Sequence, residues 1–208
     1  MTNSNLVHLV MILDRSGSMA STAQDVIGGF NKFKQDQSAQ SYKANMTVVL
    51  FDNEYHLLHN NIPIEKVPDL THETYFARGT TALNDAIGKT LTDVGTILAN
   101  TLEPQRPGKV IVTIFTDGQE NASREFSTEK VRQTISHQQT KYNWEFMYFG
   151  ATPDTFTSAA MYGIAADTTI LYSTHKFDKS YQVLSNTVTR GCTSGNFSFN
   201  VDERGDVS

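Results

Sequence analysis

Short apolar runs alternate with stretches of helical periodicity along this chain, and this alternation limits the fold more than any other feature. Residues 8–13, 46–51, 110–115 and 144–149 are strand-like runs in which most side chains are apolar. Such runs are typical of strands buried on both faces of a sheet. Between them, residues 83–98 place apolar side chains at steps of four, four, three and four, which is typical of an amphipathic helix. The pattern predicts an open α/β sheet.

The expected architecture is a Rossmann-like, mostly parallel sheet of about six strands with helices on both faces. One strand is antiparallel, because residues 54–59 follow a turn at Asp52-Asn53 and return beside the second strand. A sixth, weaker strand is expected at residues 168–172. Further helices are expected at residues 20–37, 127–139, 153–162 and 176–190. We expect one domain over residues 5–190 and a flexible C-terminal tail over residues 191–208, which is rich in Gly, Ser, Asn and Asp.

A polar motif follows the first apolar run directly. Residues 14–18 read Asp-Arg-Ser-Gly-Ser, so Asp14 stands at the carboxyl end of the strand and Ser16 and Ser18 follow in the turn. One carboxylate and two hydroxyls that converge on a point suit a hard divalent cation. Asp14 and Ser16 could instead cap the next helix, since Asp and Ser are common in such positions.

Two further segments strengthen the metal hypothesis. Residues 78–83 read Arg-Gly-Thr-Thr-Ala-Leu ahead of a helix, and residues 116–121 read Thr-Asp-Gly-Gln-Glu-Asn after an apolar run. In open parallel sheets, ligands bind at the carboxyl ends of the strands, near the point where the strand order reverses. We therefore expect Asp14, Thr81 and Asp117 to meet at one edge of the sheet.

The order of these three segments resembles the von Willebrand factor type A domain with its metal-ion-dependent adhesion site, over roughly residues 5–175. The resemblance implies Mg²⁺ or Mn²⁺, bound directly or through water by the first motif and by a threonine, with the last aspartate acting indirectly. In this sequence the implied metal residues are Asp14, Ser16, Ser18, Thr81 and Asp117. Thr81 is preferred over Thr80 because Thr81-Ala-Leu-Asn-Asp-Ala fits the family's Thr-x-Leu-x-Asp-Ala pattern.

Composition narrows the partners that the chain can bind. The net charge is −5 and no Lys/Arg cluster is present, which argues against nucleic acid. No stretch approaches the ~20 apolar residues that cross a bilayer, so no membrane segment is expected. Cys192 is the only cysteine and the first residues lack the features of a signal peptide, which favours a cytoplasmic location. The resemblance points to stand-alone domains of bacteria and their phages.

The function expected from these residues is a non-enzymatic, metal-dependent protein interaction. Three hydroxyls and one directly bound carboxylate leave a dication undercompensated, so an Asp or Glu carboxylate of a partner protein can complete its coordination. The alternative is a metal-assisted phosphohydrolase with Asp14 as nucleophile. That mechanism needs a second acid, commonly two residues on, where this chain has Ser16. A serine hydrolase fits less well, because neither Ser16 nor Ser18 lies in a Gly-x-Ser-x-Gly motif.

Overall fold

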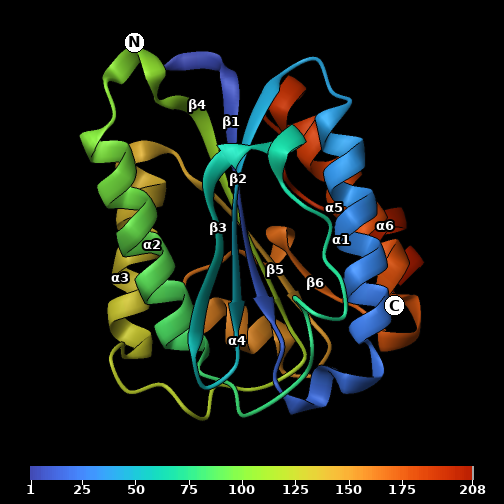
Figure 1. Cartoon of the computed structure of the whole chain (residues 1–208). Helices are drawn as coiled ribbons and strands as arrows, with labels where there is room; N and C mark the ends of the chain where they lie inside the picture. Colours follow the sequence, from blue (N-terminus) through green and yellow to red (C-terminus); the bar gives the residue numbers. More distant parts are fainter. Residues whose placement is uncertain (208) are drawn as a thin grey trace.

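The computed structural model describes residues 1–207, and six strands within them form one sheet with the order β3-β2-β1-β4-β5-β6 (Figure 1). The strands are β1 (Asn3–Asp14), β2 (Lys43–Phe51), β3 (Tyr55–Pro63), β4 (Pro107–Thr116), β5 (Glu145–Gly150) and β6 (Thr169–Leu171). All neighbouring strands pair in parallel except β2 and β3, which pair antiparallel. The predicted α/β fold, with its one antiparallel hairpin strand, is confirmed.

Helices cover both faces of the sheet. They are α1 (Ala23–Ser38), α2 (Leu83–Asn100), α3 (Thr128–Tyr142), α4 (Thr155–Met161), α5 (Phe177–Ser194) and α6 (Val201–Val207). Helices α2, α3 and α4 lie over one face, and α1, α5 and α6 lie over the other (Figure 1). Among residues 1–207, no helix combines the length and the apolar character that a bilayer crossing requires.

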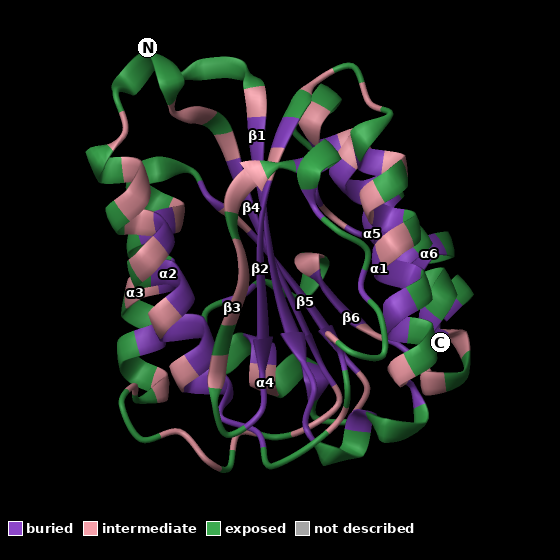
Figure 2. Cartoon of the chain, viewed as in Figure 1, coloured by how far each residue is buried: buried purple, intermediate pink, exposed green. Residues whose placement is uncertain are grey.

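The central strand β1 shows why the apolar runs are continuous. Leu9, Met11 and Leu13 face the core shared with α1 and α5, whereas Val10 and Ile12 face the core shared with α2 and α3. All five are at most 2% exposed, and the middle of the sheet is uniformly buried in Figure 2. Because successive side chains of a strand point to opposite faces, a strand between two helical layers must be apolar at every position.

The strand order brings two chain segments together at one edge. β1 lies between β2 and β4, so the sheet grows outward in both directions from the β1–β4 pair. The two strands are parallel, and their carboxyl ends point to the lower edge in Figure 1. Asp14 is the last residue of β1 and Asp117 follows the last residue of β4. The reversal point therefore lies between the two aspartates.

Residues 191–207, part of the segment expected as a flexible tail over residues 191–208, contain the end of α5 and helix α6. Helix α5 continues to Ser194, and the described residues beyond it fold back onto the sheet. Phe197, Phe199 and Val207 are buried in the same core as α1 and α5. Composition alone is misleading here because a few apolar side chains anchor a segment that is otherwise polar. Residue 208 lies outside the described part of the chain.

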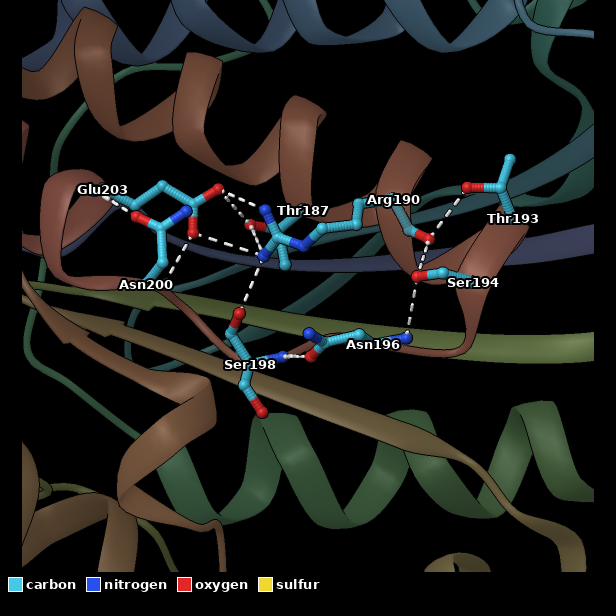
Figure 3. A network of polar contacts seen from close by, with 8 residues as sticks. All are labelled: Thr187, Arg190, Thr193, Ser194, Asn196, Ser198, Asn200 and Glu203. Carbon is cyan, nitrogen blue, oxygen red and sulfur yellow. Dashed lines mark hydrogen bonds and ion pairs between the residues drawn. The ribbon is translucent and has the colours of Figure 1, made fainter.

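A polar network fixes this C-terminal segment (Figure 3). Arg190 donates from Nη1 to Oε1 of Glu203 at 2.5 Å and from Nη2 to the Ser198 carbonyl at 2.7 Å. Glu203 accepts from the Asn200 amide at 2.8 Å, and the Asn200 side chain accepts from the Glu203 amide at 2.8 Å. This reciprocal pair caps the start of α6. The amide of Ser173 then donates to the Val207 carbonyl at 2.7 Å, which ties α6 to the chain after β6.

We expect Glu203→Ala to lower the free energy of unfolding by about 1–3 kcal/mol, because it leaves Arg190 without its carboxylate and removes the cap of α6. Denaturant unfolding measures the change. Asp202→Ala, an exposed neighbour in the same helix, is the matched control. Equal stability of the two variants would contradict the role given to the network.

His8 should make stability depend on pH. Its ring is fully buried on β1, with Nε2 2.8 Å from the Thr47 hydroxyl, and burial lowers its pKa to about 4. The unfolded chain binds a proton near pH 6.5 and the folded chain does not, so the contribution of His8 to stability decreases as pH falls from about 6.5 to about 4, by roughly 3 kcal/mol in total.

The pH effect of His8 is isolated by comparing variants. The stability difference between wild type and His8→Gln should shrink by roughly 3 kcal/mol between pH 7 and pH 4. His72→Gln, at an exposed histidine, should run parallel to wild type. A His8→Gln curve that is also parallel to wild type would show that His8 does not cause the dependence.

Candidate metal centre

Asp14 forms the buried floor of the candidate site. Its side chain is 0% exposed at the end of β1. One carboxylate oxygen accepts from the Ser16 amide at 2.7 Å, and the other accepts from the Thr116 hydroxyl at 2.6 Å. Thr116 ends β4, so this bond joins the two strands at the reversal point. The hydroxyl of Tyr75 donates to the Asp14 carbonyl at 2.5 Å and fixes the backbone at this position.

The two serines connect Asp14 with Asp117. The hydroxyl oxygens of Ser16 and Ser18 lie 3.1 Å apart, and Ser18 donates to Oδ1 of Asp117 at 2.7 Å. Ser16 is buried, whereas Ser18 is exposed and Asp117 is half-buried. The side-chain oxygens of the site thus extend from the buried Asp14 to the solvent-exposed Ser18. Four of the five predicted metal residues belong to this one chain of contacts.

Thr81, the fifth predicted residue, is held beside the same turn. It is buried, and a methyl group added to Gly118 would stand 3.0 Å from its hydroxyl oxygen. Its amide donates to the Asn121 side chain at 2.9 Å, and its carbonyl accepts from the Asn121 amide at 3.0 Å. Thr80, the neighbour not chosen, is exposed. The structure therefore brings Thr81 to the loop that carries Asp117.

Backbone hydrogen bonds join the first loop to the second. The Gly17 amide donates to the Gly79 carbonyl at 3.1 Å, and the Arg78 amide donates to the Arg15 carbonyl at 2.8 Å. Gly79 has φ +68°, and a Cβ there would stand 2.1 Å from the side-chain oxygen of Asn53. Only glycine suits that position. Thr81 reaches the site because this tight turn brings the chain back over the first loop.

Sequence reasoning did not identify the residues that fix these loops. Thr116 and Asn121 contact the predicted ligands directly, and Glu120 accepts from the Asn84 amide at 2.7 Å and from the Ser123 amide at 2.8 Å. Asp85 accepts from the Arg124, Glu125 and Phe126 amides at 2.8–2.9 Å, so it orders the third loop. The available signal was the density of Thr, Asp, Glu and Asn in residues 116–121.

Arg15, the large cation within the first motif, points away from the site. It is 5% exposed, and its Nε donates to Oδ2 of the buried Asp52 at 2.8 Å. Arg78 donates to the same oxygen at 2.8 Å and to Glu54 at 2.5 Å. Asp52 and Glu54 therefore neutralise the positive charges of Arg15 and Arg78, and neither arginine pairs with Asp14.

The electrostatics of Asp14 and Asp117 suit a cation. Burial raises the pKa of Asp14 to about 6, and the negative charge of Asp117 adds to the rise against the hydrogen bonds from Thr116 and Ser16. Burial also raises the pKa of Asp117, against the bond from Ser18. Within residues 1–207 neither carboxylate forms an ion pair with Lys, Arg or His. A buried carboxylate without a cation is costly, and a bound dication would offset that cost.

The donor set selects the kind of ion. Two carboxylates and two serine hydroxyls lie along one chain of contacts, and the Thr81 hydroxyl lies beside the adjoining Gly118 turn; such oxygen groups suit hard cations such as Mg²⁺ and Mn²⁺. Among the described residues, no group of three or more His, Cys, Asp and Glu side chains is arranged to hold a metal. A site built mainly from hydroxyls lies outside that pattern. The residues present therefore fit a hard dication in which much of the coordination comes from Ser and Thr.

The cavity next to the candidate site is smaller than a cavity at the other end of the sheet. A cavity of about 510 Å³ lies between α2 and α3 at the opposite end of the sheet, next to Pro107 and Trp144. It contains no cluster of acidic groups. A smaller cavity of about 260 Å³ adjoins the candidate site through Gly118.

The fold is that of von Willebrand factor type A domains, on the basis of solved structures. The von Willebrand factor domain of the pilus tip protein Mfa5 from Porphyromonas gingivalis matches 89% of this chain and 96% of its own length, with a TM-score of 0.61 and 11% identity. Manganese-loaded TRAP protein of Plasmodium vivax matches 84% of this chain and 71% of its own, with a TM-score of 0.59 and 16% identity.

Mussel byssus proximal thread matrix protein 1, solved with zinc in its metal-ion-dependent adhesion site, matches 92% of this chain with a TM-score of 0.61 and 17% identity. This chain spans about half of that protein's length, 47%. No family model matches the chain, and a search of curated proteins found no match. At these identities the comparisons establish the fold, and the argument for a site depends on the side chains.

Asp14→Asn should stabilise the protein when chelator is present. The change removes a buried, unpaired charge but keeps an oxygen for the Ser16 amide, so we expect a gain of roughly 1–3 kcal/mol in the free energy of unfolding at neutral pH. Denaturant unfolding in EDTA measures it, with the exposed Asp202→Asn as control, for which little change is expected. If Asp14→Asn were less stable than wild type in EDTA, the Asp14 charge would not be uncompensated in the folded protein.

Proposed function

We propose that this chain is a non-enzymatic protein interaction module that binds Mg²⁺ or Mn²⁺ at the carboxyl edge of its sheet. Asp14, Ser16, Ser18 and Thr81 would hold the ion directly or through water, and Asp117 would support it through Ser18. The ion would supply a Lewis-acidic position for a carboxylate. A partner protein would provide that carboxylate from an Asp or Glu side chain.

One observation carries the proposal: a fully buried carboxylate, which has no ion pair with Lys, Arg or His within residues 1–207, lies in contact with a chain of hydroxyls that opens to solvent. Asp14 is 0% exposed, and contacts of 2.7–3.1 Å lead through Ser16 and Ser18 to Asp117. Two proteins of the same fold, from mussel and Plasmodium vivax, were solved with zinc and with manganese. The zinc occupies an adhesion site of the type that this sequence resembles.

The exposure of the site favours a partner's side chain as the remaining ligand. Asp14 and Ser16 close the inner side, whereas Ser18 is exposed and Asp117 is half-buried. An ion held at the inner oxygens would therefore present its free positions outward. A carboxylate suits such a position because the protein's own donors are mostly uncharged.

The phosphohydrolase alternative has less support. Both oxygens of Asp14 accept hydrogen bonds, from Ser16 and Thr116, and the side chain has no exposed surface from which to attack a substrate. The position two residues on is Ser16, which cannot protonate a leaving group as a carboxylic acid would. The arrangement suits a ligand to an ion better than a nucleophile.

Metal binding is tested most simply by Mn²⁺ titration followed by electron paramagnetic resonance. Wild type should bind one ion, and Asp14→Ala should abolish binding because it removes the directly bound carboxylate. Asp117→Ala should weaken binding by about 10- to 100-fold, as expected for a residue that orients a ligand. Asp202→Asn should bind as wild type does.

Partner binding is tested with acidic peptides in Mg²⁺ and in EDTA. Binding should need the metal, the Asp or Glu of the peptide, and Asp14. Equal affinity in Mg²⁺ and EDTA, or equal affinity of wild type and Asp14→Ala, would contradict the proposal. Turnover of a phosphoester that disappears in Asp14→Asn would favour the hydrolase instead. Bacterial or phage origin and a cytoplasmic location stay predictions.

A further inference from the structure

A cavity of about 260 Å³ opens beside the candidate metal site, between the third loop and α4. Leu83, Tyr148 and Tyr162 line it on the inside, and all three are buried. Met161, which is 55% exposed, forms part of its wall at the surface. The volume is enough for one large side chain.

Gly118 joins this cavity to the metal site. It follows Asp117 directly, it lines the cavity, and a methyl group on it would stand 3.0 Å from the Thr81 hydroxyl. The same backbone turn is therefore a wall of both. A partner segment that places a carboxylate at the site has its neighbouring side chains within reach of the cavity.

The mouth of the cavity is acidic. Asp154 is exposed and accepts from the Gln119 side chain at 2.8 Å, and Glu120 is half-buried with its oxygens bonded to backbone amides. Within residues 1–207, neither carboxylate forms an ion pair. The negative charge of Glu120 also contributes to raising the pKa of Tyr162, after burial and the neighbouring Tyr148. The cavity thus combines an apolar interior with unpaired negative charge.

On the other side of the candidate metal site, next to β2 and β3, the carboxylates are paired with arginines. There Asp52 and Glu54 are already paired with Arg15 and Arg78, whose guanidinium groups lie 5.7 and 5.9 Å from the ring of the exposed Phe76. That flank has no unpaired carboxylate among these residues. The carboxylates Asp154 and Glu120 on the α4 side, unlike Asp52 and Glu54, are without an ion pair within residues 1–207 and can attract a cation from the partner.

We propose that the cavity receives an Arg or Lys side chain that stands one or two residues from the partner's metal-binding Asp or Glu. The aliphatic stem packs against Met161 and Tyr148, and the charged end meets Asp154 and Glu120. This inference rests on the proposed function, because the carboxylate on the metal places the basic side chain. It defines the partner's motif as an acid with a basic neighbour and places the basic side chain on the α4 side of the ion.

Short capped peptides in Mg²⁺ test the inference. Each peptide has one Asp in an alanine background, with Arg one or two positions before or after it, and each has a twin with Gln in place of Arg. Dissociation constants come from NMR titration, which reaches millimolar affinities, with the Met161 methyl signal as a local readout. We expect the best Arg peptide to bind about threefold more tightly than its Gln twin, as is typical of a partly exposed ion pair.

The matched variants are Asp154→Asn and Asp206→Asn. The first removes charge at the cavity but keeps an oxygen for Gln119, and the second removes an exposed charge on α6. The preference for Arg should disappear in Asp154→Asn and persist in Asp206→Asn, and Arg peptides should shift the Met161 methyl signal more than their Gln twins do.

The outcomes separate this inference from the proposed function. Metal-dependent binding with no preference for Arg at any position overturns the inference and leaves the proposed function standing. A preference for Arg that survives in Asp154→Asn also overturns it. Binding that is the same in EDTA, or no binding of any peptide at millimolar concentration, counts against both.

Discussion

The buried carboxylate of Asp14 is the constraint on which the rest of this structure depends. It stands at the end of the central strand with hydrogen bonds from Ser16 and Thr116, and no Lys, Arg or His within residues 1–207 forms an ion pair with it. An uncompensated charge in such a place destabilises the fold unless an ion or a proton neutralises it. Under the proposed function, the stability of this edge and its capacity to bind an ion have the same origin.

Three loops from distant parts of the chain keep that carboxylate among other oxygens. Backbone bonds hold Gly17 to Gly79, and paired bonds hold Thr81 to Asn121, so the site does not depend on its side chains alone. The same turn that carries Asp117 forms the wall of the acidic cavity beside α4. Under the proposed function, a partner that reaches the ion would have to fit the surface next to it.

The fold could be predicted from the sequence because its signal is repeated: each buried strand must be apolar at every position, and each helix must be apolar on one face. The convergence of Asp14, Ser18 and Asp117 followed from the rule for the carboxyl ends of parallel strands. The positioning bonds of Asn121 could not be predicted, because they depend on loop conformation. The packing of residues 197–207 on the sheet gave little signal in the sequence, since only a few apolar residues there are buried in the core.

The central claim is that a divalent cation completes this edge of the sheet. A crystal structure of the protein grown with Mn²⁺, with anomalous diffraction data, tests it most directly. The account predicts an anomalous peak within bonding distance of oxygens of Asp14, Ser16 and Ser18, with Thr81 reached directly or through water. Saturating Mn²⁺ with no peak there, and a lysine or arginine side chain paired with Asp14 instead, would contradict it.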